Sequence, residues 1–254
     1  MDGMERVRVF ASAWLNETAP MDSHSSGFTH THTGQNSLSC IHSSILCFTT
    51  MTLGIDVAGL VNASAWACIA AASVDWTATR AWHSYGAFDK NAIANLGGAV
   101  SAGIPSNDVY LFPCPTKDAS QQASDMLKAL GSNFSGKVWI DVEYNPSPGC
   151  SWSSISTGCV FLRETVATIQ QQGVGVGVYS SHYDWNNTVG LDCQLQGEYD
   201  LSLWYAHYDG VATSCSDFTP FGGWSAPVMK QFTDKPSTPG LSACGVSMDT
   251  SASC

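Results

Sequence analysis

The sequence predicts a single α/β domain in which a mostly parallel β-sheet is closed or nearly closed. Two observations lead to this fold class. From Leu53 onward, short β-branched segments alternate with alanine-rich segments of helical periodicity, as in parallel sheets with crossover helices. The chain also has 254 residues, of which 44% are hydrophobic and only 12% are charged, which suits one large core.

The expected elements follow from these patterns. Strands are expected at 54–58, 108–112, 138–143, 174–179, 201–207 and 228–232. Helices are expected between them at 91–102, 119–130 and 160–171. Asp118 is the expected N-cap of the second helix, and Gly131 and Gly173 are expected to end the second and third helices.

The first part of the chain differs in composition. Residues 1–52 are rich in Ser, Thr and His and lack sustained periodicity. A signal peptide does not begin at Met1, because Glu5 and other charges interrupt any apolar core, although a short apolar patch lies at 45–48. We therefore expect residues 1–52 to be a leader that is disordered or removed, and residues 53–254 to form the folded domain.

The charge balance excludes several functions. The formal net charge is −11, whereas nucleic acids bind clustered Lys and Arg, so no nucleic-acid partner is expected. No apolar run approaches the roughly 18 residues of a membrane span, so no membrane insertion is expected. Neither a cofactor nor a metal site is expected, because the histidines lack the spacing of metal ligands.

Ten cysteines indicate an oxidising compartment. They form no Cys-x-x-Cys pair and no zinc-type grouping, so disulfide bonds explain them better than metal binding. The expected location is therefore secreted, extracellular or lysosomal-digestive. The sequence leaves the connectivity open for the eight cysteines of the main domain, which are Cys68, Cys114, Cys150, Cys159, Cys193, Cys215, Cys244 and Cys254.

The segment 137–144, Lys-Val-Trp-Ile-Asp-Val-Glu-Tyr, carries the strongest functional signal. Its alternation places Asp141 and Glu143 on one face of a strand, about 6.6 Å apart at Cα. Two carboxylates that close cannot both ionise freely, so one pKa should rise. Glycoside hydrolysis requires such a pair, one to protonate the leaving oxygen and one to act on the developing oxocarbenium ion. The alternative is an exposed edge strand with two solvated acids.

Other polar and aromatic residues fall near the ends of predicted strands. Tyr179, Trp204 and Gln231 are expected to line a sugar-binding cleft, since α/β barrels place their sites at the carboxyl ends of the strands. The alternative is that each packs in the core. Arg80 is a further candidate for substrate binding, either paired with the acids or simply exposed. His83, His182 and His207 are interpreted as structural or hydrogen-bonding residues.

Two further acids complete a recognisable order of motifs. Asp56 lies in the first predicted strand, and Asp249 lies near the end of the given sequence. The motifs are Gly-Ile-Asp-Val at 54–57, Trp-Ile-Asp-Val-Glu at 139–143, Gly-Val-Tyr-Ser-Ser at 177–181, Leu-Trp-Tyr-Ala-His-Tyr-Asp at 203–209, Phe-Gly-Gly-Trp at 221–224, Lys-Gln-Phe at 230–232 and Gly-Val-Ser-Met-Asp at 245–249. Together they resemble the family 25 glycoside hydrolases, the muramidase type of lysozyme, and are most similar to its animal and protist secreted branch.

This resemblance, from Leu53 onward, implies an irregular TIM-like β/α barrel and cleavage of the β-1,4 bond between N-acetylmuramic acid and N-acetylglucosamine in peptidoglycan. By motif, Glu143 matches the general acid/base, Asp141 its partner carboxylate and Asp56 the first-strand acid. Asp249 matches the late acid less closely, because the preceding loop diverges from the family pattern.

The sequence therefore predicts a monomeric lysozyme of digestion or antibacterial defence, with peptidoglycan as its partner. Because the chain is acidic, we expect better activity at low pH and modest sensitivity to salt. Two alternatives stay open. A catalytically silent sugar-binding barrel would not need Asp56, Asp141 and Glu143. A chitinase-like hydrolase would use a longer acidic strand pattern than this chain has, and turnover of peptidoglycan against chitin oligomers would separate it.

Overall fold

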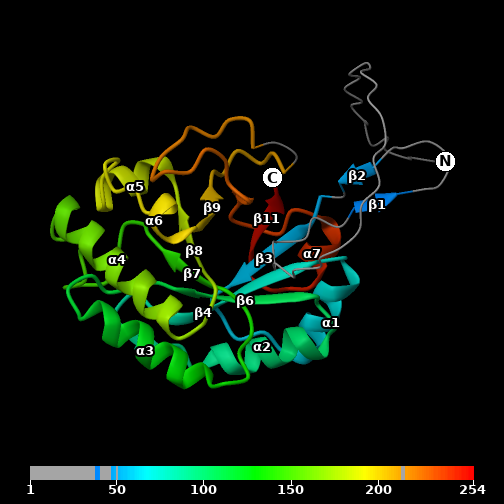
Figure 1. Ribbon diagram of the computed structural model, residues 1–254. Coiled ribbons are helices and arrows are strands. Elements are labelled where there is room, and N and C mark those ends of the chain that lie inside the picture. Colours follow the sequence, from blue (N-terminus) through cyan, green and yellow to red (C-terminus); the bar gives the residue numbers. More distant parts are fainter. Residues whose placement is uncertain (1–37, 41–46, 50, 213–214) are drawn as a thin grey trace, which may run out of the picture.

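The computed structural model describes residues 38–40, 47–49, 51–212 and 215–254. Within these residues, eight strands close into a barrel around which helices are arranged (Figure 1). The barrel strands are β3 (Leu53–Val57), β4 (Trp76–His83), β6 (Ser106–Leu111), β7 (Val138–Asp141), β8 (Val176–Ser180), β9 (Ser202–Ala206), β10 (Met229–Thr233) and β11 (Asp249–Ser253). The predicted α/β barrel is confirmed.

The order of strands around the barrel follows the chain except at its closure. Neighbouring strands from β3 through β4 and β6 to β10 are parallel, whereas β11 is antiparallel to both β10 and β3 and lies between them. The short strand β5 (Ala87–Phe88) pairs only with β4, outside the barrel. The sheet is therefore closed and mostly parallel, as predicted, with one reversed strand that makes it irregular.

Two barrel strands were not among the expected ones. β4 is buried on both faces for most of its length, so its sequence lacks the alternation that marks a half-buried strand. β11 has the sequence Asp-Thr-Ser-Ala-Ser and no apolar run, yet Thr250 and Ser251 are fully buried. β7 is also shorter than the predicted strand 138–143, because only Val142 continues its ladder, donating to the carbonyl of Tyr179.

The helices are α1 (Ala63–Ala71), α2 (Asn91–Ser101), α3 (Ala119–Leu130), α4 (Ile155–Gln171), α5 (His182–Thr188), α6 (Gln196–Tyr199) and α7 (Pro239–Ala243). Figure 1 shows α1 to α4 arranged along the outside of the barrel. As predicted, Asp118 caps α3 by accepting from the amide of Gln121, and Gly131, with a φ of 80°, ends it. α4 begins earlier than predicted because the Ser154 side chain caps it.

Tryptophans fill the inside of the barrel. Trp76, Trp139 and Trp204 pack edge to face, with ring centroids 4.9 to 6.4 Å apart. Glycines on the neighbouring strands make room for two of them: a Cβ on Gly177 would lie 2.5 Å from the Trp139 ring, and one on Gly54 would lie 2.3 Å from Trp76. The absence of a side chain at these two positions therefore leaves space for the tryptophan rings.

A buried carboxylate forms the floor beneath these rings. Asp108 Oδ2 accepts from the indole nitrogens of Trp76, at 2.7 Å, and of Trp139, at 2.9 Å. Its Oδ1 accepts from the backbone amide of Lys137 at 2.8 Å. The floor is therefore a hydrogen-bonded unit that fixes two indole rings, and the cavity above it is confined to the opposite end of the barrel.

Four disulfide bonds connect the eight cysteines of the main domain, as the cysteine usage predicted. They join Cys68 to Cys244, Cys114 to Cys150, Cys159 to Cys193 and Cys215 to Cys254. The first links α1 to the end of α7 across a sequence separation of 176 residues. It therefore ties together two segments that flank the closure of the barrel.

Replacing Cys68 and Cys244 together by Ser is expected to lower the free energy of unfolding by about 4 kcal/mol, because the bond closes a very long loop of the unfolded chain. Denaturant unfolding under non-reducing conditions measures this loss. Each single Ser variant should lose about as much as the double variant, since either one breaks the bond. A double variant within about 1 kcal/mol of the parent would contradict the expectation.

Two short strands, β1 (Leu38–Cys40) and β2 (Cys47–Thr49), pair antiparallel within the predicted leader. Residues 1–37, 41–46 and 50 lie outside the described residues, so the leader prediction for 1–52 is left as a prediction. Among the described helices, none combines the length and apolar character needed to cross a bilayer.

Candidate active site

A cavity of about 200 Å³ lies at the carboxyl ends of the barrel strands. All eight residues that the sequence singled out line it, although they are spread over nearly 200 positions of the chain. Its lining consists of Asp56, Arg80, Tyr110, Phe112, Asp141, Glu143, Tyr179, Trp204, Tyr208, Gln231 and Asp249. The closed barrel brings them together because each lies between the middle of a parallel strand and the loop just beyond its carboxyl end, or at the start of the reversed strand β11.

Four carboxyl groups share this cavity. Asp56 on β3 and Asp249 on β11 are directly paired in register. Asp141 ends β7, and Glu143 follows two residues later, beyond the end of the strand. The prediction that both acids lie on one strand therefore fails by two residues, but the alternation still places both side chains in the same cavity.

Glu143 has the properties of an acid near neutral pH. Burial raises the pKa of its carboxyl to about 7, and the negative charges of Asp184 and Asp249 add to the increase. Asp184 lies at the start of α5, where its Oδ2 accepts from the Ser181 hydroxyl at 2.6 Å. Its other oxygen accepts from the backbone amide of Tyr144 at 3.3 Å. Glu143 is thus held protonated up to about neutral pH by its surroundings.

Asp141 is the most isolated of the four acids. Its side chain is buried, and Oδ1 is one of three buried side-chain N or O atoms without a hydrogen-bond partner among the described residues. Burial raises the pKa of Asp141 well above its usual value, and the charges of Glu143 and Asp56 raise it further. A buried polar atom without a partner is uncommon and costly, which points to a role outside the folded chain's own network.

Gln231 links the other two acids to a tyrosine pair. Its Nε2 donates to Asp56 Oδ1 at 2.7 Å and to Asp249 Oδ2 at 3.3 Å. Its Oε1 accepts from the hydroxyls of Tyr179 and Tyr208, each at 2.6 Å. These contacts use the amide fully, so its orientation is fixed.

The two aspartates that Gln231 contacts also have raised pKa values. Burial raises the pKa of Asp249 to about 6, with a smaller contribution from Asp234. Burial likewise raises the pKa of Asp56 well above its usual value, and the Asp249 charge adds to this, while the hydrogen bond from Gln231 opposes it. The whole cluster therefore retains protons that isolated carboxyl groups would lose.

The contacts of Trp204 and Arg80 differ from those expected of residues whose only role is to line a cleft. The Trp204 ring is 2% exposed and donates to the Ser251 hydroxyl at 3.0 Å, so it belongs to the barrel core while one part borders the cavity. Arg80 lines the cavity but does not pair with its acids. Its Nε donates to Asp89 at 2.9 Å, and Nη2 donates to the carbonyl of Ala58 at 3.2 Å.

Four residues of the site and its surroundings were not predicted from the sequence. Tyr110, Phe112 and Tyr208 line the cavity, and Asp184 acts on Glu143 through its charge. Tyr110 shares the inward face of its strand with Asp108, so the period of two could have identified it. Asp184 could have been found from Ser181-x-x-Asp184, a helix-start pattern directly after a strand.

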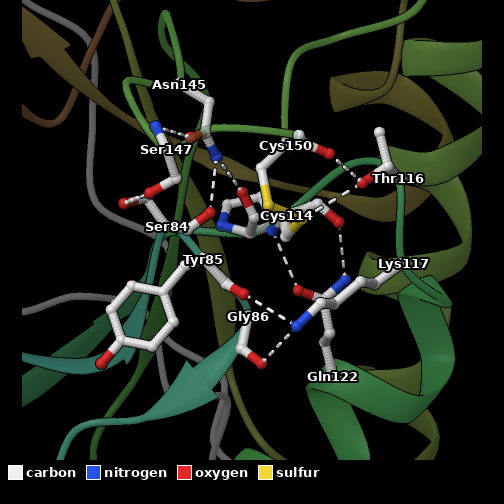
Figure 2. The surroundings of a disulfide bond; sticks show 12 residues. Ser84, Tyr85, Gly86, Cys114, Thr116, Lys117, Gln122, Asn145, Ser147 and Cys150 are labelled. Carbon is white, nitrogen blue, oxygen red and sulfur yellow. Dashed lines mark hydrogen bonds between the residues drawn. A yellow bond between two sulfur atoms is a disulfide. The ribbon is translucent and has the colours of Figure 1, made fainter.

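The loop that follows Glu143 is fixed by Asn145 and a disulfide bond (Figure 2). Asn145 is 2% exposed, and its Nδ2 donates to the carbonyls of Ser84 and Pro113, both at 2.8 Å. The Cys114–Cys150 bond joins the same loop to the one after β6. Three loops that follow three successive barrel strands are therefore held as one unit beside Glu143.

A closed barrel whose cavity gathers four carboxyl groups with raised pKa values is an arrangement suited to the acid–base chemistry of a glycosidase. A family model described as "Lysozyme-like protein 1" matches residues 48–232. "Probable GH family 25 lysozyme 2" of Dictyostelium discoideum is 38% identical over 192 residues, covering 74% of this chain and 86% of that protein. "Lysozyme-like protein 5" of Caenorhabditis elegans is 34% identical over 202 residues, covering 77% and 88%.

A solved structure agrees in fold. The family GH25 lysozyme from Aspergillus fumigatus superposes with a TM-score of 0.64 at 21% identity, covering 81% of this chain and 94% of that one. The chain belongs to the GH25 lysozyme family, and the resemblance inferred from its motifs is confirmed.

Proposed function

We propose that this protein is a lysozyme that hydrolyses the β-1,4 bond between N-acetylmuramic acid and N-acetylglucosamine in bacterial peptidoglycan. The observation that carries the proposal is the placement of Glu143, with a pKa of about 7, in the same cavity as the buried Asp141. A proton donor and a second carboxyl group on one cavity are what cleavage of a glycosidic bond requires.

In this proposal Glu143 donates its proton to the glycosidic oxygen as the bond breaks. Asp141 and Asp56 stabilise the positive charge that develops on the sugar ring, or orient the acetamido group. The unpartnered Oδ1 of Asp141 supports the second role, because an acetamido N–H would supply the missing donor. Gln231 holds Asp56 and Asp249 in place, and Tyr179 and Trp204 border the bound sugar.

The alternatives are less well supported. A silent sugar-binding barrel has no use for a cluster of acids that carry raised pKa values, since such groups destabilise the fold at neutral pH. A chitinase-like activity is opposed by the match to relatives named as lysozymes. The four disulfide bonds support secretion, because they form in oxidising compartments. An antibacterial or digestive role and action as a monomer belong to the same proposal.

Turbidity loss of bacterial cell walls, measured with the purified oxidised chain, tests the proposal. Release of new reducing ends from peptidoglycan identifies glycosidic cleavage, and chitin oligomers serve as the competing substrate. Faster turnover of peptidoglycan is expected. Turnover of chitin oligomers alone would favour the chitinase-like alternative, and binding of peptidoglycan without cleavage would favour the silent barrel.

The pH dependence of lysis follows from Glu143. A general acid acts only when it is protonated, so activity is present below the pKa of about 7 and is lost as pH rises through it. We expect kcat/KM to fall by about tenfold per pH unit on the alkaline side. A pH profile measured at constant ionic strength checks this, and activity that continues to rise above pH 8 would contradict the role of Glu143.

A further inference from the structure

Among residues 51–212 and 215–254, the exposed aromatic side chains are gathered at one end of the barrel. From residue 51 onward in the described chain, four aromatic side chains are strongly exposed: Tyr85 at 52%, Tyr144 at 74%, Tyr183 at 75% and Tyr208 at 53%. The other large exposed apolar residues in this part are aliphatic or Met. Each of these tyrosines follows the carboxyl end of a barrel strand, namely β4, β7, β8 and β9. Aromatic exposure is therefore confined to the end that carries the cavity.

Tyr208 already belongs to the cavity through its hydrogen bond to Gln231, whereas the other three do not line it. We call Tyr85, Tyr144 and Tyr183 the rim tyrosines. An aromatic ring that stays exposed to water adds little to the stability of the fold, because it buries little apolar surface. Exposed aromatic groups that gather around a cavity are typical of a binding surface.

Two of the rim tyrosines lie on one side of Glu143. Tyr144 follows Glu143 directly, and Tyr183 precedes Asp184 at the start of α5. The two loops are joined because the backbone amide of Tyr144 donates to Asp184 Oδ1 at 3.3 Å. Asp184 is in turn anchored by Ser181, whose hydroxyl donates to Oδ2 at 2.6 Å. These two side chains are the most exposed aromatic groups among residues 51–212 and 215–254.

Tyr85 lies in the turn after β4 and is connected to the cavity by a chain of contacts. Arg80, which lines the cavity, binds Asp89 at 2.9 Å, and His83 Nε2 lies 3.4 Å from the same carboxylate. The His83 ring stacks on the Tyr85 ring, with centroids 4.7 Å apart and planes 16° from parallel. This stacking covers one face of Tyr85 and fixes its plane.

The turn that carries Tyr85 is rigid. Its carbonyl accepts from Lys117 Nζ at 2.8 Å, and Gly86 adopts a φ of 78°, which favours glycine. The neighbouring Ser84 binds Ser147 through their hydroxyls at 2.7 Å and accepts from Asn145. Figure 2 shows the Tyr85 ring directed away from this network, which includes the Cys114–Cys150 bond. The ring is thus preorganised at little entropic cost to binding.

We propose that the rim tyrosines are stacking subsites for sugar rings on either side of the scissile bond, so that the protein binds a run of several sugars of a linear β-1,4-linked amino-sugar polysaccharide. The flat faces of such rings present C–H groups that pack on an aromatic face. A tyrosine ring is uncharged, so it can bind a sugar without the electrostatic attraction that this acidic protein lacks. The cavity of about 200 Å³ is too small for more than a short part of such a chain, so neighbouring sugars must lie over the rim. This inference rests on the proposed function and describes how far the substrate-binding surface extends beyond the cavity.

Chain-length preference tests the inference. The ratio of kcat/KM for long peptidoglycan glycan strands to that for a tetrasaccharide is expected to fall about tenfold in Tyr183→Ala and in Tyr85→Ala, which corresponds to the loss of one stacking contact. Tyr183→Phe and Tyr85→Phe keep the ring and should keep the ratio within about twofold of the parent. Val100→Ala, on the exposed surface of α2, is the control for an unrelated apolar truncation.

A second measurement separates the inference from the proposed function. Calorimetric binding of long glycan strands to the Glu143→Gln chain does not depend on cleavage, and it should weaken about tenfold when Tyr183→Ala or Tyr85→Ala is added. Tyrosine-dependent binding without any cleavage by the parent would support the subsites while rejecting the lysozyme function. Cleavage with an unchanged chain-length ratio in both Ala variants, or an equal loss on long and short substrates, would overturn the inference.

Discussion

Replacing Glu143 by Gln is expected to lower the rate of cell-wall lysis by a factor of about 10² to 10⁴. The change removes the proton donor while keeping the size of the side chain and nearly its shape. Glutamine cannot give up a proton at any accessible pH, so the residual activity should also lose the alkaline limb near pH 7. Initial rates of turbidity loss and of reducing-end release, measured across pH 4 to 9, check both parts of this expectation.

A matched variant controls for the change of Glu to Gln itself. Glu164 is exposed on α4, outside the cavity, and Glu164→Gln should retain the parent rate and pH profile. Circular dichroism and thermal unfolding would establish that Glu143→Gln is folded. A folded Glu143→Gln chain that lyses walls at close to the parent rate would remove Glu143 from the mechanism and leave Asp141 as the first acid to test.

Replacing Asp108 by Ala is expected to lower the free energy of unfolding by about 4 kcal/mol, because it leaves two buried and one partly buried N–H donors without an acceptor. These are the indole nitrogens of Trp76 and Trp139 and the backbone amide of Lys137. Since the two indoles pack beneath Trp204, the loss should spread through the interior of the barrel. Denaturant unfolding followed by tryptophan fluorescence measures both the stability and the change around the rings.

Two further variants define what Asp108 contributes. Asp108→Asn keeps one carbonyl oxygen and should recover part of the lost stability, since it can still accept from the donors on one side. The exposed Asp192, changed to Ala, should alter stability by less than about 0.5 kcal/mol. If Asp108→Ala were as stable as Asp192→Ala, the hydrogen bonds at the barrel floor would have no net stabilising effect.

The sequence predicted the strands that follow simple periodicity and missed those that do not. The valines of β8 alternate with other residues, as do the acids at and just beyond the end of β7, so both strands were identified. β11 consists of small polar residues whose burial depends on β3 and β10, far away in the chain. No local signal distinguishes such a strand from a loop, because what buries it is long-range pairing.

The residues that line the candidate site were predicted more completely than the strands, whereas the roles of the site residues stay predictions. Its eight predicted residues were found by chemical type and by motif order, and all of them line one cavity. The interactions among them were not predictable: Arg80 pairs with Asp89 rather than with the acids, and Trp204 uses its indole nitrogen on Ser251. The influence of Asp184 on Glu143 arises from the juxtaposition of two loops, which only the closed barrel creates.

The reversed strand β11 affects how the barrel closes during folding. β3 finds β4 within a short stretch of chain, but its other edge stays open until β11 arrives from the far end of the domain. Contacts between such distant segments form slowly, because the intervening loop must first lose its freedom. Until then, β3 and β10 expose unpaired edges, and such edges can pair with strands of other chains and cause aggregation. Asp249 belongs to the same strand, so the cavity gains its fourth acid only when the barrel closes.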